Sequence, residues 1–482
     1  MEALSVKEIV MAVGGVLLSG DENIKITSVS TNSRELDEGA LFVPIIGERV
    51  DGHRFIPGAI ETGAKAVFTV YVPEELNKGA AYIKVDNTLA ALQRLAGYYR
   101  NMFNIPVVGI TGSVGKTTTK EMIAAVLATS YQVVKTQGNM NSQVGLSLTL
   151  FHIEKRHQVA VVEMGMSEPG EMEKLAQIAR PTITVVTNIG VSHIAQLGSK
   201  ENIRKEKLNI IDEGTDNHVL YVNGQDTLLK ELVTFKDLLA EEKKALPLAT
   251  KTCDALKHTI VKTYGIGEGY SFLAKDVISR NEQTTFTYVS GQSSVEVTLN
   301  VLGEHNVMNG VVALAIGEQL GIDAKKGKQG LYAYKPIAMR GQIVKSNGLV
   351  IIDDTYNASP DSMKSGIDVL LSLEGVRRRI AVLADILELG ETSYQLHYEV
   401  GEAIVKDALM GKKLDELVVI GENAKAIADA VEKSKVGIIT NTFTNNEEAA
   451  SYLRKNLLSG DAILVKGSRG MHTDEIVKAL SE

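Results

Sequence analysis

The chain of 482 residues has very little of several features that define other classes of protein. It has one cysteine, Cys253, so no disulfide can form within the chain, which fits a reducing compartment. No apolar run reaches the roughly 18–20 residues that cross a membrane as a helix. The sequence also lacks a short-period repeat and a low-complexity tract. What is present, 44% hydrophobic and 23% charged residues, is typical of a globular protein.

Basic charge is scarce relative to acidic charge. Lys and Arg number 51 against 59 Asp and Glu, which gives a net charge of −8. An acidic chain without a long basic run argues against nucleic acid as the main partner. The net charge does not exclude a local basic pocket that binds a small anion.

The N-terminal region contains an apolar stretch at residues 9–18 (IVMAVGGVLL) that has the length of a signal-peptide core. However, Glu2 and Glu8 stand where a basic leader is expected. Ser5 and Glu8 have the spacing of a helix capping box, and Gly14 can end the helix. We therefore expect a short folded helix and a cytoplasmic protein.

Alternating strand and helix patterns predict an α/β protein of three domains. Residues 1–103 mix short strands with turns and end in a helix, which suggests a small α/β substrate domain. Residues 104–336 predict a central, doubly wound, mostly parallel sheet, with antiparallel strands at 284–302. Residues 337–482 repeat strand and helix and predict a Rossmann-like third domain. Two α/β domains in series suggest a ligand cleft between them.

The stretch GITGSVGKTTTKEM, which starts at Gly109, predicts a phosphate-binding loop. A buried strand leads through a glycine turn into a helix, so backbone N–H groups and the helix dipole point at one spot. Gly112 and Gly115 allow close approach, Lys116 can reach terminal phosphates, and Thr117 can offer a hydroxyl to Mg²⁺. The strict G-x-x-x-x-G-K-[ST] pattern fails at position 110, which is Ile.

Polar residues follow the next strands of the same region. VAVVEMG ends near Glu163, and a carboxylate at the carboxyl end of a parallel strand lies where ligands bind. Such an oxygen ligand suits Mg²⁺. The following strand leads into TNIGVSH, which places Asn188 and His193 nearby.

The motifs TGSVGKTT, VVEMG, TNIGVSH and LGEHNVMN, in this order, resemble the Mur ligase family along essentially the whole chain. The resemblance implies ATP-driven amide formation during synthesis of the peptide of cell-wall precursors. Among family members, the chain most resembles those that add D-alanyl-D-alanine to UDP-N-acetylmuramoyl-tripeptide. The supporting stretches are SVSTNSRELDEGALFVPIIGERVDGHRF, DDTYNASPDSM, VLADILELGETSYQLH and LVKGSRGMHTDEIV, and no Asp-Asn-Pro-Arg stretch is present.

The resemblance implies roles for individual residues. Lys116, Lys207, Arg340 and His193 would be catalytic, and Thr117, Glu163, His193 and Lys207 would surround Mg²⁺. Contacts to ATP are expected from Thr111, Gly112, Ser113, Val114, Gly115, Lys116, Thr117, Thr118, Asn306, Asn309, Arg340, Asp354 and Tyr356. Contacts to the substrates are expected from Ser33, Arg34, Gly47, Asp51, Gly52, His53, Asn139, Asn141, Asn357 and Asp385.

Lys207 matches a lysine that carries a CO₂-derived carbamate in this family and helps to hold a second Mg²⁺. The segment KENIRKEKLNII is also a charged amphipathic helix, and Lys205 competes for the alignment. Lys207 is favoured because it leaves Ile203, Ile210 and Ile211 for the buried face.

The chain departs from the family pattern in two places. Ala384-Asp385-Ile386 replaces the more usual Gly-Asp-Met, and Arg340 lies in Met339-Arg340-Gly341 rather than after a glycine. The second departure puts the reach of Arg340 in question. Neither change removes a charged group that the chemistry needs.

The implied mechanism activates the terminal carboxylate of the tripeptide as an acyl phosphate, which the amine of D-alanyl-D-alanine then attacks. Asp385 and His397 are candidates for the base that takes the proton of the amine. Domain closure and a monomeric state are expected. The alternatives are a sister ligase that adds lysine, diaminopimelate or glutamate, and a nucleotide-binding partner protein without catalysis. The sequence leaves open whether the third residue of the tripeptide is lysine or diaminopimelate.

Overall fold

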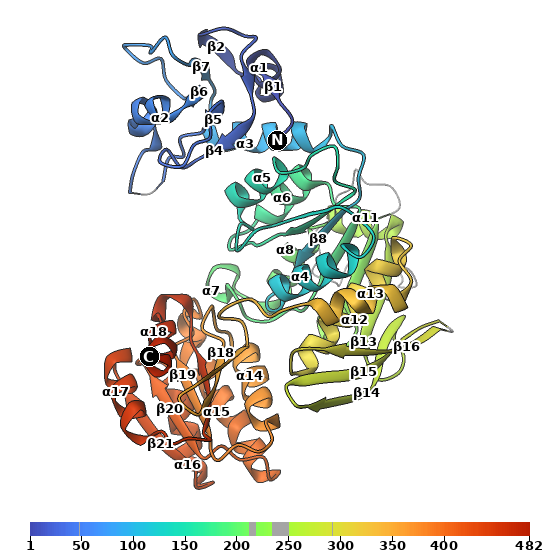
Figure 1. Cartoon of the computed structure of the whole chain (residues 1–482), viewed down its shortest axis with the longest axis vertical. Helices are drawn as coiled ribbons and strands as arrows, with labels where there is room; N and C mark the ends of the chain where they lie inside the picture. Colours follow the sequence, from blue (N-terminus) through green and yellow to red (C-terminus); the bar gives the residue numbers. More distant parts are fainter. Residues whose placement is uncertain (48, 212–217, 234–249, 292) are drawn as a thin grey trace.

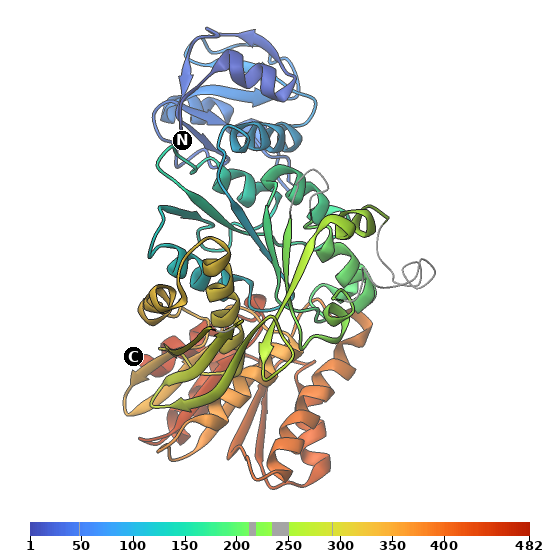
Figure 2. The same ribbon diagram turned by 90° about the vertical axis from the view of Figure 1, so that its right-hand side faces the viewer.

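The computed structural model describes residues 1–47, 49–211, 218–233, 250–291 and 293–482. Each of the three parts of the chain has its own main sheet, and the parts follow one another along the long axis of the molecule (Figure 1). The N-terminal part lies at one end and the C-terminal part at the other, which the view turned by 90° also shows (Figure 2). The central part therefore has a neighbour at each end.

The N-terminal part is a five-stranded sheet with the order β2-β7-β6-β5-β4 and three helices. The first helix has the predicted capping box between Ser5 and Glu8, and Gly14 ends it with φ 63°. The strands are β2 (Val16–Ser19), β4 (Ser28–Ser30), β5 (Ala40–Phe42), β6 (Ala64–Thr69) and β7 (Ala81–Lys84), with a small pair of β1 (Leu4–Ser5) and β3 (Lys25–Ile26), and the helices are α1 (Val6–Val13), α2 (Ile56–Thr62) and α3 (Thr88–Arg100).

The central sheet has nine strands in the order β16-β15-β14-β13-β12-β11-β8-β10-β9. It is parallel from β9 to β14 and antiparallel from β14 to β16, because the last three strands form consecutive hairpins. The expected antiparallel strands at 284–302 are thus present, although residue 292 of their turn lies outside the described residues. The strands are β8 (Val107–Thr111), β9 (Val133–Lys135), β10 (Val159–Glu163), β11 (Ile183–Val186), β12 (Val219–Asn223), β13 (Ile260–Ile266), β14 (Phe272–Arg280), β15 (Gln283–Ser290) and β16 (Ser293–Leu299).

Helices cover both faces of the central sheet. On one face, α4 (Lys116–Leu127) packs with α12 (Glu304–Gln319) and α13 (Ala324–Ala333). On the other face, α5 (Gln143–Leu150), α6 (Glu171–Ala179) and α8 (Lys200–Leu208) share a core with α3 of the N-terminal part. Three further helices of the central part are α7 (Ile194–Leu197), α9 (Thr227–Lys230) and α11 (Thr250–His258).

The C-terminal part is a six-stranded sheet with the order β17-β18-β22-β19-β20-β21, antiparallel only at β17. One face packs against α14 (Pro360–Ser372), α15 (Ser393–Leu409) and α16 (Lys425–Ser434), and the other against α17 (Asn446–Asn456) and α18 (Asp474–Ser481). The strands are β17 (Gln342–Ser346), β18 (Leu349–Asp353), β19 (Arg379–Ala384), β20 (Glu416–Ile420), β21 (Ile439–Phe443) and β22 (Ala462–Lys466).

The predicted α/β class and three-part architecture are confirmed by these sheets. The boundaries at 103/104 and 336/337 stay predictions. No helix within the described residues is long and apolar enough to cross a bilayer.

Candidate active site

The central sheet brings three strand ends together. β8 lies between β10 and β11, so the chain leaves β8 toward one side of the sheet and returns to build the other side. In parallel α/β sheets, such a reversal opens a crevice at the carboxyl ends of the strands. The loops after β8, β10 and β11 carry the phosphate loop, Glu163 and the Asn188–His193 segment, which therefore face the same crevice.

The phosphate loop needs glycine at one position for a steric reason. Gly112 has φ 149°, and a Cβ there would lie 1.8 Å from Thr187 Oγ1. Gly115, with φ 85°, is the N-cap of α4 and places Lys116 at the first helical position. The first N–H groups of a helix have no intrahelical acceptor and attract anions. The loop therefore ends in a set of backbone donors that can hold a phosphate.

Asn188 holds the first half of the loop. The N–H of Ser113 donates to Asn188 O at 3.1 Å, and the N–H of Val114 donates to Asn188 Oδ1 at 2.9 Å. These two amides are thus occupied, and the backbone donors left for a ligand begin at Gly115. Thr111 and Gly112, which were expected to contact the nucleotide, shape the loop but do not line the cavity beside it.

Lys116 lies over the loop itself. Its Nζ donates to Gly112 O at 2.8 Å. Burial lowers the pKa of Lys116, Glu163 opposes this effect, and Arg340 adds to it. The Lys116 ammonium group is therefore repelled by the charge of Arg340, and a bound anion would stabilise both cations.

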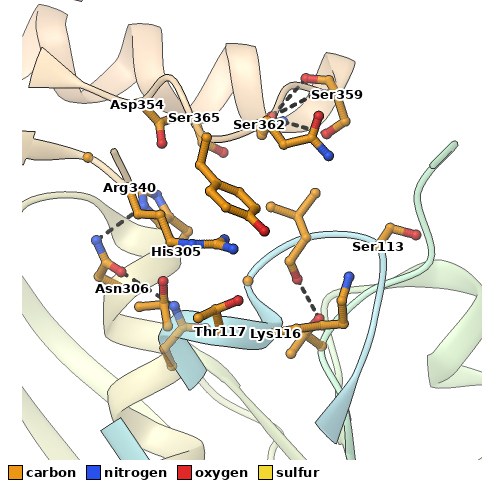
Figure 3. Close-up of a pocket in the computed structure, with 18 of the residues that line it drawn as sticks. Ser113, Lys116, Thr117, His305, Asn306, Arg340, Asp354, Ser359, Ser362 and Ser365 are labelled. Atoms are coloured by element: carbon orange, nitrogen blue, oxygen red, sulfur yellow. Dashed lines mark hydrogen bonds between the residues drawn. The ribbon is translucent and has the colours of Figure 1, made fainter. Parts of the chain in front are cut away.

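A cavity of about 790 Å³ opens from this loop between the central and C-terminal parts. Figure 3 shows Ser113, Lys116 and Thr117 on one side and Asp354, Ser359 and Ser362 on the other. The cavity brings together fifteen of the predicted site residues, namely Ser113, Val114, Gly115, Lys116, Thr117, Thr118, Asn141, Glu163, His193, Asn306, Asn309, Arg340, Asp354, Tyr356 and Asn357.

Glu163 at the end of β10 has a free ligand atom. Its Oε1 accepts a hydrogen bond from Asn141 Nδ2 at 2.7 Å, while its buried Oε2 has no partner. A buried carboxylate oxygen without a partner is costly unless something binds it. Within the described residues there is no group of three or more His, Cys, Asp or Glu side chains placed to hold a metal. Any ion here would therefore draw part of its ligand set from other groups.

Lys207 on α8 is 2% exposed, whereas Lys205 faces solvent. Burial lowers the pKa of Lys207 well below its ordinary value, and the charge of Lys116 adds to the effect. None of the hydrogen bonds or ion pairs found within the described residues involves its Nζ. Burial thus distinguishes the two lysines, although Lys207 does not itself line the cavity.

His193 lines the cavity from the N-cap position of α7. Its Nδ1 lies 2.9 Å from Glu388 Oε2 of the C-terminal part, at ion-pair distance but without the angles of a hydrogen bond. This contact holds the pKa of Glu388 below its ordinary value.

Arg340 reaches the cavity from the start of the C-terminal part, despite its unusual sequence context. Its guanidinium lies over the ring of Tyr356, 3.9 Å from the centroid, and the N–H of Tyr356 donates to Met339 O. Met339 has φ 65° and Gly341 has φ 68°, so the backbone is in the left-handed region on both sides of Arg340. The stack fixes the direction of the guanidinium, as is common for arginine on aromatic rings.

Asn306 and Asn309, two of the expected contacts to ATP, lie in the first two turns of α12. Asn309 Oδ1 accepts a hydrogen bond from Thr119 Oγ1 at 2.8 Å, and Asn306 Nδ2 donates to Leu302 O at 2.7 Å. Asn309 thus ties α12 to α4, the helix of the phosphate loop.

Lys466 is a cavity residue that sequence reasoning missed. It is 2% exposed on β22, and its Nζ donates to Asp354 Oδ2 at 2.5 Å and to Asn357 O at 2.9 Å. The motif LVKGSRG contains it, but only the fold shows that it supports the loop after β18. Further cavity residues without a sequence-based role include His305, Ser359, Ser362, Ser365, Glu171 and Ser192.

The structure does not bring Asn139 and Asp385 into the cavity. Asp385 is buried, and its Oδ1 accepts from the N–H of Ala424 at 2.7 Å. His397 is fully buried, with Nε2 facing the N–H of Ile386 and Nδ1 facing Ser393 O. Because both side chains are engaged in holding loops, the expectation that one of them is the base for the amine is not supported.

The N-terminal candidates form a separate group. Of the residues before Ser113 that the structure describes, none lines the cavity. His53 is buried, with Nδ1 2.6 Å from Asp51 Oδ1 and Nε2 accepting from the N–H of Val70. A Cβ at Gly52 would lie 2.7 Å from Ile45 O. These three residues therefore hold the loop in shape. Asp51 is nevertheless exposed, as are Arg34 and Gly47, and Ser33 is half-buried.

Sequence profiles of one family match most of the chain. The profile "Mur ligase family, catalytic domain" matches residues 25–100, "Mur ligase middle domain" matches 110–317, and "Mur ligase, glutamate ligase domain" matches 339–469. A protein of Bacillus subtilis (strain 168) is 38% identical over 480 residues, covering 99% of this chain and 98% of the relative. The chain belongs to the Mur ligase family.

The relatives share one name. The Bacillus subtilis protein is named UDP-N-acetylmuramoyl-tripeptide--D-alanyl-D-alanine ligase, as is a protein of Escherichia coli (strain K12) that is 29% identical over 100% of this chain and 99% of its own length. Among solved structures, MurF from Acinetobacter baumannii has a TM-score of 0.85 at 26% identity, covering 100% of this chain and 99% of that one. MurF from Thermotoga maritima in complex with ADP has a TM-score of 0.78 at 28% identity, covering 94% and 97%.

Proposed function

We propose that the chain is an ATP-dependent ligase that joins D-alanyl-D-alanine to UDP-N-acetylmuramoyl-tripeptide through an acyl phosphate, with release of ADP and phosphate. The observation that carries this proposal is the 38% identity, along essentially the whole chain, to a ligase named for this reaction. The cavity supports it, because one site holds a phosphate loop, an orphaned carboxylate and an arginine from a second sheet.

The first step must bring a carboxylate to the γ-phosphate of ATP, which is also an anion. Lys116 and Arg340 face the same cavity and would neutralise this charge. Catalysis of this kind consists mainly of positioning and electrostatic stabilisation. In this proposal Tyr356 holds Arg340, and Lys466 holds the Asp354 loop on the nucleotide side.

Magnesium fits the oxygen-rich side of the cavity. Thr117, at the first turn of α4, and Glu163, with its unpartnered Oε2, are hard oxygen donors of the kind that Mg²⁺ prefers. Bound there with the triphosphate, Mg²⁺ would neutralise charge on the phosphates. His193 lies on the same cavity and is proposed as a further ligand.

Lys207 is proposed to carry a carbamate. Only a neutral amine can attack CO₂, and burial, which lowers the pKa of Lys207, favours the neutral form. Bond formation between the neutral Nζ and the carbon of CO₂ releases one proton and converts a neutral amine into an anion, which can then serve as a metal ligand. A carbamate resonance in the NMR spectrum after exposure to ¹³CO₂, absent in Lys207→Arg but present in Lys205→Arg, is expected.

The remaining substrate roles follow the family resemblance. The exposed loops around Arg34 and Gly47 are proposed to receive the uridine diphosphate group, and the C-terminal part is proposed to receive D-alanyl-D-alanine near Asn357. A cytoplasmic location and a monomeric state belong to the same proposal.

The test is phosphate release from ATP with the UDP-linked tripeptide, with and without D-alanyl-D-alanine. Release that requires both substrates, together with a heavier UDP product in mass spectrometry, is the expected result. Release with lysine, diaminopimelate or glutamate and the matching shorter precursor would instead assign a sister activity. ATP binding without release under any of these conditions would favour a non-catalytic partner protein.

A further inference from the structure

The turn at residues 386–390 of the C-terminal part packs against the loop of the central part that carries His193. Val191 and Leu389 belong to one apolar cluster. A Cβ at Gly390 would lie 3.2 Å from Ala195 Cβ, and a Cβ at Gly190 would lie 2.8 Å from Asp361 Oδ2. The two parts thus approach each other closely on both sides of His193.

Within this contact, one carboxylate faces one imidazole. Glu388 Oε2 lies 2.9 Å from His193 Nδ1, and the side chain of His193 is 25% exposed against 56% for Glu388. The contact has the distance of a hydrogen bond but not its angles. No other ion pair within the described residues involves this imidazole.

The backbone at both residues is unusual. His193 has φ 63° and Glu388 has φ 66°, and they are two of the ten described non-glycine residues with positive φ. Residues other than glycine rarely adopt a backbone conformation with positive φ. It persists only where the surrounding structure determines it. The two residues that meet across the interface are therefore both placed there by a constrained backbone.

We infer that Glu388 is a positioning residue, which holds His193 in the tautomer and orientation that direct Nε2 into the cavity toward the metal. A carboxylate beside Nδ1 favours the tautomer with its proton on that atom, and this leaves the lone pair on Nε2 for a ligand. Carboxylate partners of metal-binding histidines act in this way. The inference rests on the proposed function, because it takes His193 to be a metal ligand.

A consequence is that the C-terminal part contributes to the metal site without touching the metal. Glu388 and Arg340 lie in the C-terminal part, whereas His193 and the phosphate loop lie in the central part. The metal site is thus complete only when the two parts are docked. By linkage, bound metal must then favour the docked arrangement.

The experiment measures Mn²⁺ binding to the full chain with a saturating β,γ-methylene analogue of ATP, using the electron paramagnetic resonance signal of free Mn²⁺. Glu388→Gln is expected to weaken Mn²⁺ binding by about 10–100-fold. Glu388→Lys, which places a cation beside the imidazole, is expected to weaken it at least as much. Glu391→Gln is the matched control, because Glu391 is exposed in the same segment and forms none of the ion pairs to histidine found in the described part of the chain.

A double-mutant cycle separates positioning from general damage. If Glu388 acts through His193, then Glu388→Gln added to His193→Ala changes Mn²⁺ affinity no further. Equal affinities of the wild type and Glu388→Gln, or a further loss in the double variant, would overturn the inference and leave the proposed ligase intact. A wild-type protein that turns over its substrates but shows no analogue-dependent Mn²⁺ binding would overturn the metal assignment on which the inference rests.

Discussion

At the scale of single residues, the cavity is notable for cations that have too few anions around them. Lys116 and Arg340 interact unfavourably with each other, and Glu163 is the acidic group that counteracts this for Lys116. Lys116 donates to a carbonyl of its own loop, a weaker partner than a phosphate oxygen. A bound triphosphate would reduce the repulsion between Lys116 and Arg340 and would give Lys116 a stronger hydrogen-bond acceptor.

Replacement of Lys116 tests this account. Lys116→Met keeps most of the side-chain volume and removes the charge, so we expect kcat for phosphate release to fall by about 10²–10³-fold. Steady-state assays at saturating ATP check the loss. Lys230→Met, at an exposed position of the central part, serves as the control and should keep the wild-type kcat. An unchanged kcat in Lys116→Met would contradict a role for this charge in the transition state.

His397 gives a prediction with a defined pH dependence. Burial holds its pKa below the ordinary value of 6.5. The native state therefore binds fewer protons than the unfolded state, so the stability that this residue contributes is present above pH 6.5 and is lost as pH falls toward the native pKa.

The amide of Ile386 reports this loss locally, because it donates to His397 Nε2 at 2.9 Å and protonated Nε2 cannot accept. Hydrogen exchange of the 386–397 segment, corrected for the intrinsic effect of pH, should show protection that decreases below pH 6.5. In His397→Leu, the protection at this amide should be lower at all pH values and no longer depend on pH. Equal pH dependence in both proteins would show that another group is responsible.

At the scale of elements, most site residues that the sequence could predict lie directly after strands of the central sheet. The loop after β8 and Glu163 at the end of β10 follow from local patterns, since a buried strand before a glycine turn has a recognisable sequence. The occupation of two loop amides by Asn188 depends on the neighbouring position of β11, which no local pattern determines. The contact between His193 and Glu388 likewise joins two sheets and required the fold.

The same limit applies to residues whose type suits two roles. His53, Asp51 and Asp385 have side chains that could meet a substrate, but the fold uses them to hold loops through backbone N–H groups. Short-range sequence cannot distinguish a polar group that faces a ligand from one that faces a loop amide. Lys466 is the reverse case. Its buried ammonium group holds Asp354 beside the cavity, but no pattern in the sequence marks this lysine as a site residue.

The phosphate loop gives a prediction at the scale of an element. Gly112→Ala would place a Cβ 1.8 Å from Thr187 Oγ1, so the loop must shift. A strain of about 1–3 kcal/mol in a binding loop corresponds to about 5–150-fold weaker ATP binding. Gly138→Ala is the matched control, because Gly138 also has positive φ but nothing lies within 4 Å of its added Cβ. Calorimetric titration with ATP checks both, and equal affinities of the two variants would contradict the steric account.

At the scale of the whole molecule, the cavity belongs to two parts that are separate in the chain. Phosphate-loop residues and Arg340 line one space, although their sheets share no strand. Sites built between two parts commonly close around their substrates. Small-angle scattering with an ATP analogue and both substrates should therefore give a smaller radius of gyration than the free protein. An unchanged radius would count against closure.

The distance between the N-terminal part and the cavity also limits which UDP-linked precursors can react. The N-terminal part, whose residues include Arg34, lies at one end of the molecule (Figure 1). The cavity is lined by residues of the central and C-terminal parts instead. A precursor anchored by its nucleotide at one end presents its carboxylate in the cavity only if its peptide spans the distance between them. Under the proposed binding mode, this requirement selects precursors by length, and we expect a precursor one residue too short to be rejected because its carboxylate stops before the phosphate.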